Sequence, residues 1–222
     1  MPAFHPGADD LPTEFPVFPL EGALLLPRGR LPLNIFEPRY LAMTEDALGA
    51  GRMFGMIQPD PAARETGCGP GLYRIGCLGR LASFSETDDG RFLITLNGVI
   101  RFAVQSELSQ CRGYRRVRGD VSGYLDDLNL EPRPIGMERE ALLAALRGYF
   151  AHRGFEANWD AIRKIPDDML VITLSMICPF EPAEKQALLE AATDRERATA
   201  LLALLQMGAV AEDAPAGRRR AS

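Results

Sequence analysis

The two lysines of this 222-residue chain, Lys164 and Lys185, limit the chemistry it can perform. A P-loop needs a Gly-Lys-Ser/Thr sequence, because the lysine contacts the β- and γ-phosphates and the hydroxyl binds magnesium. Lys164 follows Arg163 and Lys185 follows Glu184, so neither belongs to such a loop. The nearest glycine-rich run, residues 67–71 (GCGPG), has no third glycine at the place that a dinucleotide-binding fingerprint requires. The sequence therefore excludes P-loop ATPase activity, and we expect no cofactor.

Nucleophilic catalysis would need a serine or cysteine beside a base. The two histidines are His5, near the N-terminus, and His152, near the end of an expected helix, and the chain has no GxSxG nucleophile elbow. A serine could meet Lys164 or Lys185 in space, but both lysines lie among charged residues, whereas a depressed lysine pKa needs burial or a cationic neighbour. An enzyme built on such a pair, or on Glu37 with a second acid, is the least favoured alternative.

The acidic and thiol side chains have no spacing typical of a metal site. The paired carboxylates lie at expected turns or helix starts, where aspartate bonds to the local backbone: Asp88-Asp89, Asp126-Asp127 and Asp167-Asp168. No two of the four cysteines, Cys68, Cys77, Cys111 and Cys178, form a CxxC pair. We expect four reduced thiols, with Cys77 and Cys178 buried, and no metal.

Basic residues cluster once within the expected folded part, at Arg112, Arg115, Arg116 and Arg118. On a strand, Arg116 and Arg118 would share a face, which suits contacts to phosphate. A solvated sheet edge blunted by charge explains the same cluster. The formal net charge of −5 argues against general affinity for nucleic acid, because such binding rests on phosphate neutralisation. Nucleic-acid binding through these arginines therefore stays an alternative.

No segment has the pattern of a membrane span or a secretion signal. The longest apolar run is residues 170–178, whereas a spanning helix needs about 20 apolar residues. The N-terminal sequence MPAFHPG has neither a basic flank nor an apolar stretch. We expect a soluble cytoplasmic protein.

Residues 15–125 are dominated by alternation with a period of two. Asp89-Gly90 is a turn dipeptide, and the following strand alternates Phe92, Ile94 and Leu96 against Arg91 and Thr95. Asn97-Gly98 is interpreted as a second turn, after which the alternation resumes. The pattern predicts an antiparallel meander that curls into a barrel, interrupted by one helix that starts near Pro38 and ends at Gly49.

Residues 126–208 predict a helical bundle. Its boundary signals are Gly154 as a C-cap, Asp167 as an N-cap, Pro182 at a helix start and a capping box at Thr193-Asp194-Arg195-Glu196. We expect four parts: a flexible arm at 1–14, the strands at 15–125, the bundle at 126–208 and a disordered tail at 209–222.

Several motifs together resemble the N-terminal, substrate-binding domain of Lon proteases. The opening carries most of the resemblance, in FPVFPL (15–20), LLLPRG (24–29) and LPLNIFEPRY (31–40). Further matches follow in order at FGM (54–56), IGCLG (75–79), DGR (89–91), LNGVIRF (96–102), PFEPAEKQALLE (179–190) and RER (195–197). The resemblance covers about residues 13–208. It departs from the family at Arg28-Gly29-Arg30, where a shorter Pro-Gly turn is usual, and at residues 77–79, where GTxA is usual, which puts in doubt a contact role for that backbone.

The resemblance implies an α+β fold, in which a PUA-like, mostly antiparallel β pseudo-barrel precedes a C-terminal α-helical bundle. Full-length Lon continues into ATPase and Ser-Lys protease domains, so the chain resembles stand-alone bacterial proteins that lack both. The implied function is recognition of unfolded or degron-bearing polypeptides in protein quality control, in a Lon-type protease system and without catalysis. A PUA-like small-ligand or RNA-binding module is the alternative. Exposed sheet edges would permit a homodimer.

The expected polypeptide-binding surface would take apolar segments by strand addition or in side-chain pockets. Its candidate residues are Phe36, Arg39, Tyr40, Phe84 and Arg91. A structural role is the competing interpretation. In that interpretation Phe36 and Tyr40 lock the helix against the barrel, and Arg39 pairs with a carboxylate or a strand carbonyl.

Overall fold

The computed structural model describes residues 5–65, 67–132 and 134–210. The chain divides into two compact units. The first comprises the described parts of Met1–Pro132 together with Ser175–Glu190, and the second those of Arg133–Leu174 and Ala191–Ser222. The expected tail therefore lies outside the described residues, apart from its first two positions.

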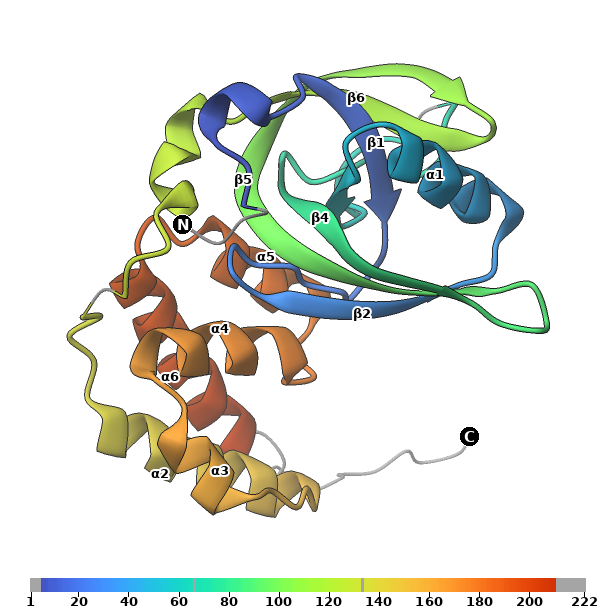
Figure 1. The fold of residues 1–222 in the computed structure, drawn as a ribbon. Helices are drawn as coiled ribbons and strands as arrows, with labels where there is room; N and C mark the ends of the chain where they lie inside the picture. The colour runs from blue at the N-terminus through green and yellow to red at the C-terminus, as the bar shows by residue number, and fades with distance from the viewer. Residues whose placement is uncertain (1–4, 66, 133, 211–222) are drawn as a thin grey trace, which may run out of the picture. The chain divides into compact units, whose positions relative to one another are not determined.

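A six-stranded sheet forms the body of the first unit. Its strands are β1 (Glu14–Pro19), β2 (Arg30–Ile35), β3 (Met53–Ile57), β4 (Ile75–Glu86), β5 (Phe92–Cys111) and β6 (Tyr114–Asp120). They are arranged in the order β2-β5-β4-β3-β1-β6, and β5 pairs with β6 as well, so the sheet curls round on itself (Figure 1). All pairings are antiparallel except β1 with β3. The predicted α+β fold with a mostly antiparallel pseudo-barrel is confirmed.

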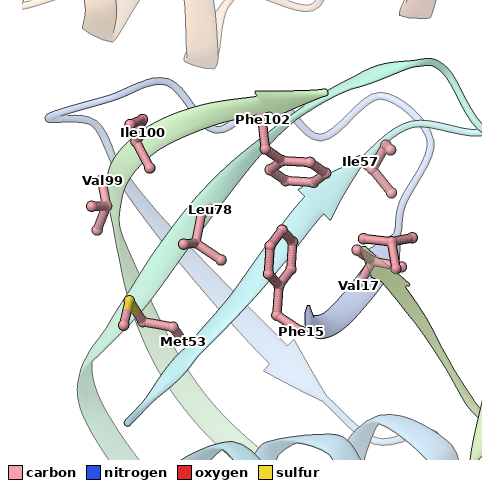
Figure 2. Close-up of a cluster of buried hydrophobic side chains, with 9 residues drawn as sticks. Phe15, Val17, Met53, Ile57, Leu78, Val99, Ile100 and Phe102 are labelled. Atoms are coloured by element: carbon pink, nitrogen blue, oxygen red, sulfur yellow. The ribbon is translucent and has the colours of Figure 1, made fainter. Parts of the chain in front are cut away.

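The core of the first unit fills the inside of the curled sheet. Phe15 from β1 meets Phe102 from β5 edge to face, with ring centroids 4.9 Å apart, and both rings are buried (Figure 2). Leu78 and Ile100 lie in the same cluster. These positions follow the alternation of the strands, because every second residue of a curled sheet faces inward.

The interpretation of Asn97-Gly98 as a turn is wrong. β5 runs unbroken through both residues, because β2 and β4 pair with it there on its two sides. The register shifts between Leu78 and Gly79, so the β5 strand has one extra residue opposite β4 at this point. A β-bulge next to a glycine shares its sequence signal with a turn, since both favour Asn and Gly.

One helix, α1 (Pro38–Gly49), interrupts the strands as predicted, with proline in its first turn. Its buried side consists of Tyr40, Ala42, Met43, Thr44 and Ala47. The hydroxyl of Thr44 donates to the Tyr40 carbonyl at 2.8 Å, so this buried polar group is satisfied within the helix.

The helix α5 (Pro182–Glu190) belongs to the first unit, although the predicted boundary at residue 126 assigns it to the bundle. Its polar side chains reach into the sheet: Gln186 donates to the Ile75 carbonyl, and Gln58 of the loop after β3 donates to the Pro182 carbonyl and to Gln186. Sequence periodicity marks α5 as helical but carries no signal of where its polar side chains bond.

The second unit contains the remaining helices, α2 (Arg139–Arg153), α3 (Trp159–Lys164), the first part of α4 (Asp167–Ile177) and α6 (Asp194–Val210). Gly208 of α6 lies so close to the Tyr149 ring of α2 that a Cβ would collide with it. Gly154 ends α2 in the left-handed conformation, and Thr193 accepts from the Glu196 amide, as the boundary signals predict. Asp167 is the first helical residue of α4, because the Leu170 amide bonds to the Pro166 carbonyl, so it is not the N-cap.

Short 3₁₀ helices lie at Ala8–Asp10 and Ser122–Leu128. The first falls within the arm that the sequence predicts to be flexible. Both segments, like α3, are too short for a periodic apolar pattern to reveal them.

Candidate functional site

A three-stranded arm projects from the first unit (Figure 1). It is formed by β2 and by the parts of β4 and β5 that lie next to the turn connecting these two strands. Residues directly opposite in an antiparallel sheet point to the same face. Arg30 lies opposite Asn97, and Asn97 lies opposite Arg80. The same face continues toward the hairpin tip with Leu93, opposite Asn34 and Ser85. We call it the arginine face.

The opposite side of the arm is the leucine face. Its cross-strand rows are Leu31, Leu96 and Leu81, then Leu33, Ile94 and Phe84, then Ile35, Phe92 and Glu86. Leu96, Leu81 and Ile94 are buried, so this face continues the core. Toward the tip the Phe84 and Phe92 rings meet edge to face at 4.9 Å, and Phe84 is 37% exposed.

The candidate residues Phe36 and Arg91 lie together at the tip of the arginine face. Ile35 of β2 pairs with Phe92 of β5. Phe36 follows Ile35 and Arg91 precedes Phe92, so the same register places Phe36 opposite Arg91. The Arg91 guanidinium lies 5.9 Å from the centre of the Phe36 ring and pairs with Asp89 at 2.8 Å. Phe36 is 62% exposed and Leu93 is 47% exposed, so an apolar surface stands open to solvent here.

The structure separates the other three candidates from this pair. Phe84 faces the opposite side of the arm, whereas Tyr40 is buried in α1 with its ring 4.0 Å from that of Phe18. Arg39 pairs with Glu37 and covers the Tyr40 ring at 4.6 Å. Burial raises the pKa of the Tyr40 phenol. These contacts agree with the competing interpretation of the sequence, in which Arg39 and Tyr40 have a structural role.

Each arginine of the basic cluster has a carboxylate partner. Arg112 pairs with Glu45 and Asp46, and Arg115, which is buried, pairs with Glu107 at 2.6 Å and donates to the Pro70 carbonyl. Arg116 and Arg118 both pair with Glu14. These carboxylates offset the positive charge that a phosphate backbone would need, so the geometry does not favour nucleic-acid binding at this cluster.

The lysines considered for catalysis have structural surroundings. Lys164 is exposed, whereas Lys185 is buried and its Nζ donates to the carbonyls of Gly22 and Met176. Burial lowers the pKa of Lys185. Its hydrogen bonds to backbone carbonyls hold α5 in place, as the amide contacts of its neighbour Gln186 do.

At least one member of each carboxylate pair has an arginine partner: Asp89 pairs with nearby Arg91, whereas Asp127 and Asp167 pair with Arg101 and Arg139, which are distant in sequence. Cys77 and Cys178 are buried, as predicted, and none of the four cysteines forms a disulfide within the described residues. Within the described ranges there is no group of three histidine, cysteine or acidic residues that could hold a metal ion. In the same part of the chain, no helix is long and apolar enough to cross a membrane.

A pocket of about 500 Å³ lies at the base of the arginine face. Three arginines line it, Arg28, Arg30 and Arg80, together with Asn97. None of these residues belongs to the candidate sites chosen from the sequence. The available signal was Arg28-Gly29-Arg30, the point at which the motif departs from the family pattern. Arg80 could not be found in this way, because only strand register brings it beside Asn97.

Comparison with known proteins accounts for this architecture. Residues 14–207 match the family model described as the ATP-dependent protease La (LON) substrate-binding domain. The chain belongs to this family. The Lon N-terminal domain protein from Xanthomonas campestris has the same fold, with a TM-score of 0.59 and 22% identity over 86% of this chain and 98% of that one.

Lon proteases are also similar in sequence. That of Anaeromyxobacter dehalogenans is 25% identical over 60% of this chain and 16% of its own length, and that of Parabacteroides distasonis is 26% identical over 91% and 25%. The chain therefore spans a quarter or less of the length of these Lon proteases. The match is to the part of the protease that the family description calls substrate-binding.

Proposed function

We propose that the chain is a Lon-type recognition module that binds unfolded or degron-bearing polypeptides in the cytoplasm, within a Lon-type protease system. The observation that carries this proposal is the exposed apolar tip of the arginine face, on a chain whose family is the LON substrate-binding domain. Unfolded polypeptides expose the apolar side chains that folded proteins bury, and such a surface can take them up.

The arm supports two kinds of contact. Phe36 and Leu93 offer apolar surface, and the Arg91 guanidinium beside them can stack on aromatic groups or pair with carboxylates. Among the described strands, none pairs with the outer edge of β2, so an extended segment could add there. Pro32 in the middle of β2 provides no N–H donor, which limits the backbone hydrogen bonds of such a strand.

Binding is tested with reduced, carboxymethylated α-lactalbumin, which is permanently unfolded, and with its native form. We expect the chain to retain the unfolded protein only. The change Phe36→Ser should weaken this binding about tenfold, because loss of an exposed aromatic anchor costs about 1–2 kcal/mol. Fluorescence anisotropy of labelled α-lactalbumin measures both affinities.

The matched control is Met207→Ser in the second unit, since Met207 is 57% exposed and therefore equally easy to replace. It should leave the affinity unchanged. Equal binding by wild type and Phe36→Ser would reject the arginine face as the binding surface, and retention of neither form of α-lactalbumin would reject polypeptide binding.

We further propose that the module has no catalytic activity of its own. The absence of a P-loop sequence and the carbonyl partners of Lys185 support this. The purified chain should release no phosphate from ATP and should leave casein intact. Turnover that disappears on replacement of Lys185 or of a serine would contradict the proposal.

A further inference from the structure

The outer edge of β2 has no partner among the described strands, and the direction of its backbone groups follows from its pairing with β5. The Gly98 amide donates to the Gly29 carbonyl and the Gly98 carbonyl accepts from the Arg28 amide, so Gly98 turns its backbone toward β2. Hydrogen-bonding direction alternates along a strand, so every second residue of β5 that pairs with β2 does the same. The partners of these residues on β2 are Leu31, Leu33 and Ile35.

The other residues of β2 therefore turn their N–H and C=O groups outward. They are Arg30, Pro32 and Asn34, and all three are exposed. Phe36 directly follows β2 and continues the same alternation. Proline has no N–H to donate, so an outward position for Pro32 costs the sheet no hydrogen bond, which agrees with this assignment. The edge thus offers amide donors at Arg30, Asn34 and Phe36 and carbonyl acceptors at these positions and at Pro32.

These donors and acceptors match those of a second copy of the same edge. An antiparallel pair related by a two-fold axis through Leu33 places Asn34 of each copy opposite Pro32 of the other. The Asn34 amide then donates to the Pro32 carbonyl across the axis. Arg30 and Phe36 lie opposite each other at both ends, where each pair exchanges two backbone hydrogen bonds.

Pro32 restricts the pairing to this register. With the axis at Pro32 itself, the two prolines would lie opposite each other, and neither would have a donor for the carbonyl of the other. With the axis at Asn34, Arg30 would lie opposite Pro38, which belongs to α1, so the paired segment would be shorter. The register centred between these two positions uses the whole strand.

The side chains fit the same register. Arg30 would lie opposite Phe36 of the other copy, where its guanidinium can cover an aromatic ring that is 62% exposed in the single chain. On the leucine face, Leu33 would meet its own counterpart and Leu31 would meet Ile35. Arg30 is the only charged residue of β2, and its two copies would lie about 20 Å apart at about 3.3 Å per residue, so like charges do not meet.

We propose that the chain forms a symmetric homodimer through the outer edges of β2, which joins the two curled sheets at their arms. The same surface of each copy is used, so the assembly closes at two copies and leaves neither β2 edge open. The dimer goes beyond the function proposed above. It covers Phe36, so an unfolded polypeptide must displace the second copy to reach the apolar tip.

Disulfide trapping tests the register in a chain whose two partly exposed cysteines, Cys68 and Cys111, are replaced by serine. Leu33→Cys should give a linked dimer on oxidation, because opposite residues of a non-hydrogen-bonded pair lie about 4.5 Å apart at Cα, within reach of a disulfide. Leu31→Cys is the matched control. Its two copies would lie about 13 Å apart along the strands at about 3.3 Å per residue, so it should give about tenfold less linked dimer. Equal trapping at the two positions, or none at Leu33→Cys, would overturn the proposal.

Analytical ultracentrifugation of the unmodified chain tests the dimer itself. Its mass should rise toward twice that of the monomer with increasing concentration, whereas Asn34→Pro should stay monomeric because it removes an outward amide and no bond to β5. Circular dichroism checks that this variant is folded. A chain that is monomeric at every concentration, or a dimer that persists in folded Asn34→Pro, would reject pairing through β2.

The same variant separates the dimer from polypeptide binding. Asn34→Pro keeps Phe36 and frees it from the second copy, so it should bind unfolded α-lactalbumin at least as tightly as the unmodified chain does. Weaker binding by a folded, monomeric Asn34→Pro would contradict the expected competition. Failure of the α-lactalbumin experiment with the unmodified chain would reject the proposed function and leave the trapping result at Leu33→Cys as it stands.

Discussion

At the scale of single residues, Gly98 connects the sheet with the loop that forms the pocket. A Cβ at this position would overlap the carbonyl of Leu26 and come close to the nitrogen of Pro27. The two backbone hydrogen bonds between Gly98 and the Arg28-Gly29 segment depend on this close approach. A glycine here therefore serves backbone packing, not the turn that the Asn-Gly dipeptide suggests.

We expect Gly98→Ala to lower the free energy of unfolding by about 2 kcal/mol or more, because backbone atoms cannot move aside as side chains do. Urea denaturation followed by circular dichroism measures the loss. Gly123→Ala is the control: nothing lies within 4 Å of its added Cβ, and its effect should stay within about 0.5 kcal/mol. A Gly98→Ala protein as stable as Gly123→Ala would show that the loop moves away at little cost.

At the scale of the elements, the sequence predicted what local patterns control. Alternation located the strands of the β4–β5 hairpin, and Pro38, Gly154 and Thr193 marked helix boundaries that the structure confirms. The alternation predicted an antiparallel sheet that curls into a barrel, and the resemblance added that it is a PUA-like pseudo-barrel. The pairing between β5 and β6 that closes it is revealed by no local pattern.

The candidate site was predicted less well, for a related reason. Phe36 and Phe84 both appear as exposed aromatic residues near turns, but strand register places them on opposite faces of the arm. Register depends on which residues of β2, β5 and β4 pair, and a shift of one residue exchanges the two faces. The arginine-lined pocket depends on the same register, which is why the sequence indicated only its Arg28-Gly29-Arg30 part.

At the scale of the whole molecule, the first unit is not continuous in sequence. Residues 175–190 return to the sheet after the second unit has begun, and they supply partners for buried groups of the barrel. The buried Arg101 donates to the Leu189 carbonyl in addition to its pair with Asp127. Gln58, which is 2% exposed, has two of its partners in the same segment.

We therefore expect a fragment of residues 1–132 to be less stable than the same fragment joined to residues 175–190 by a glycine-serine linker. Gln58 would lose two partners, and Arg101 and the Ile75 carbonyl one each, at about 1 kcal/mol per hydrogen bond. A total of about 4 kcal/mol corresponds to a melting temperature lower by about 10 °C or more in a domain of this size. Thermal denaturation followed by circular dichroism compares the two proteins. Equal melting temperatures would mean that the curled sheet is stable without α5, so that the return of residues 175–190 would need another explanation.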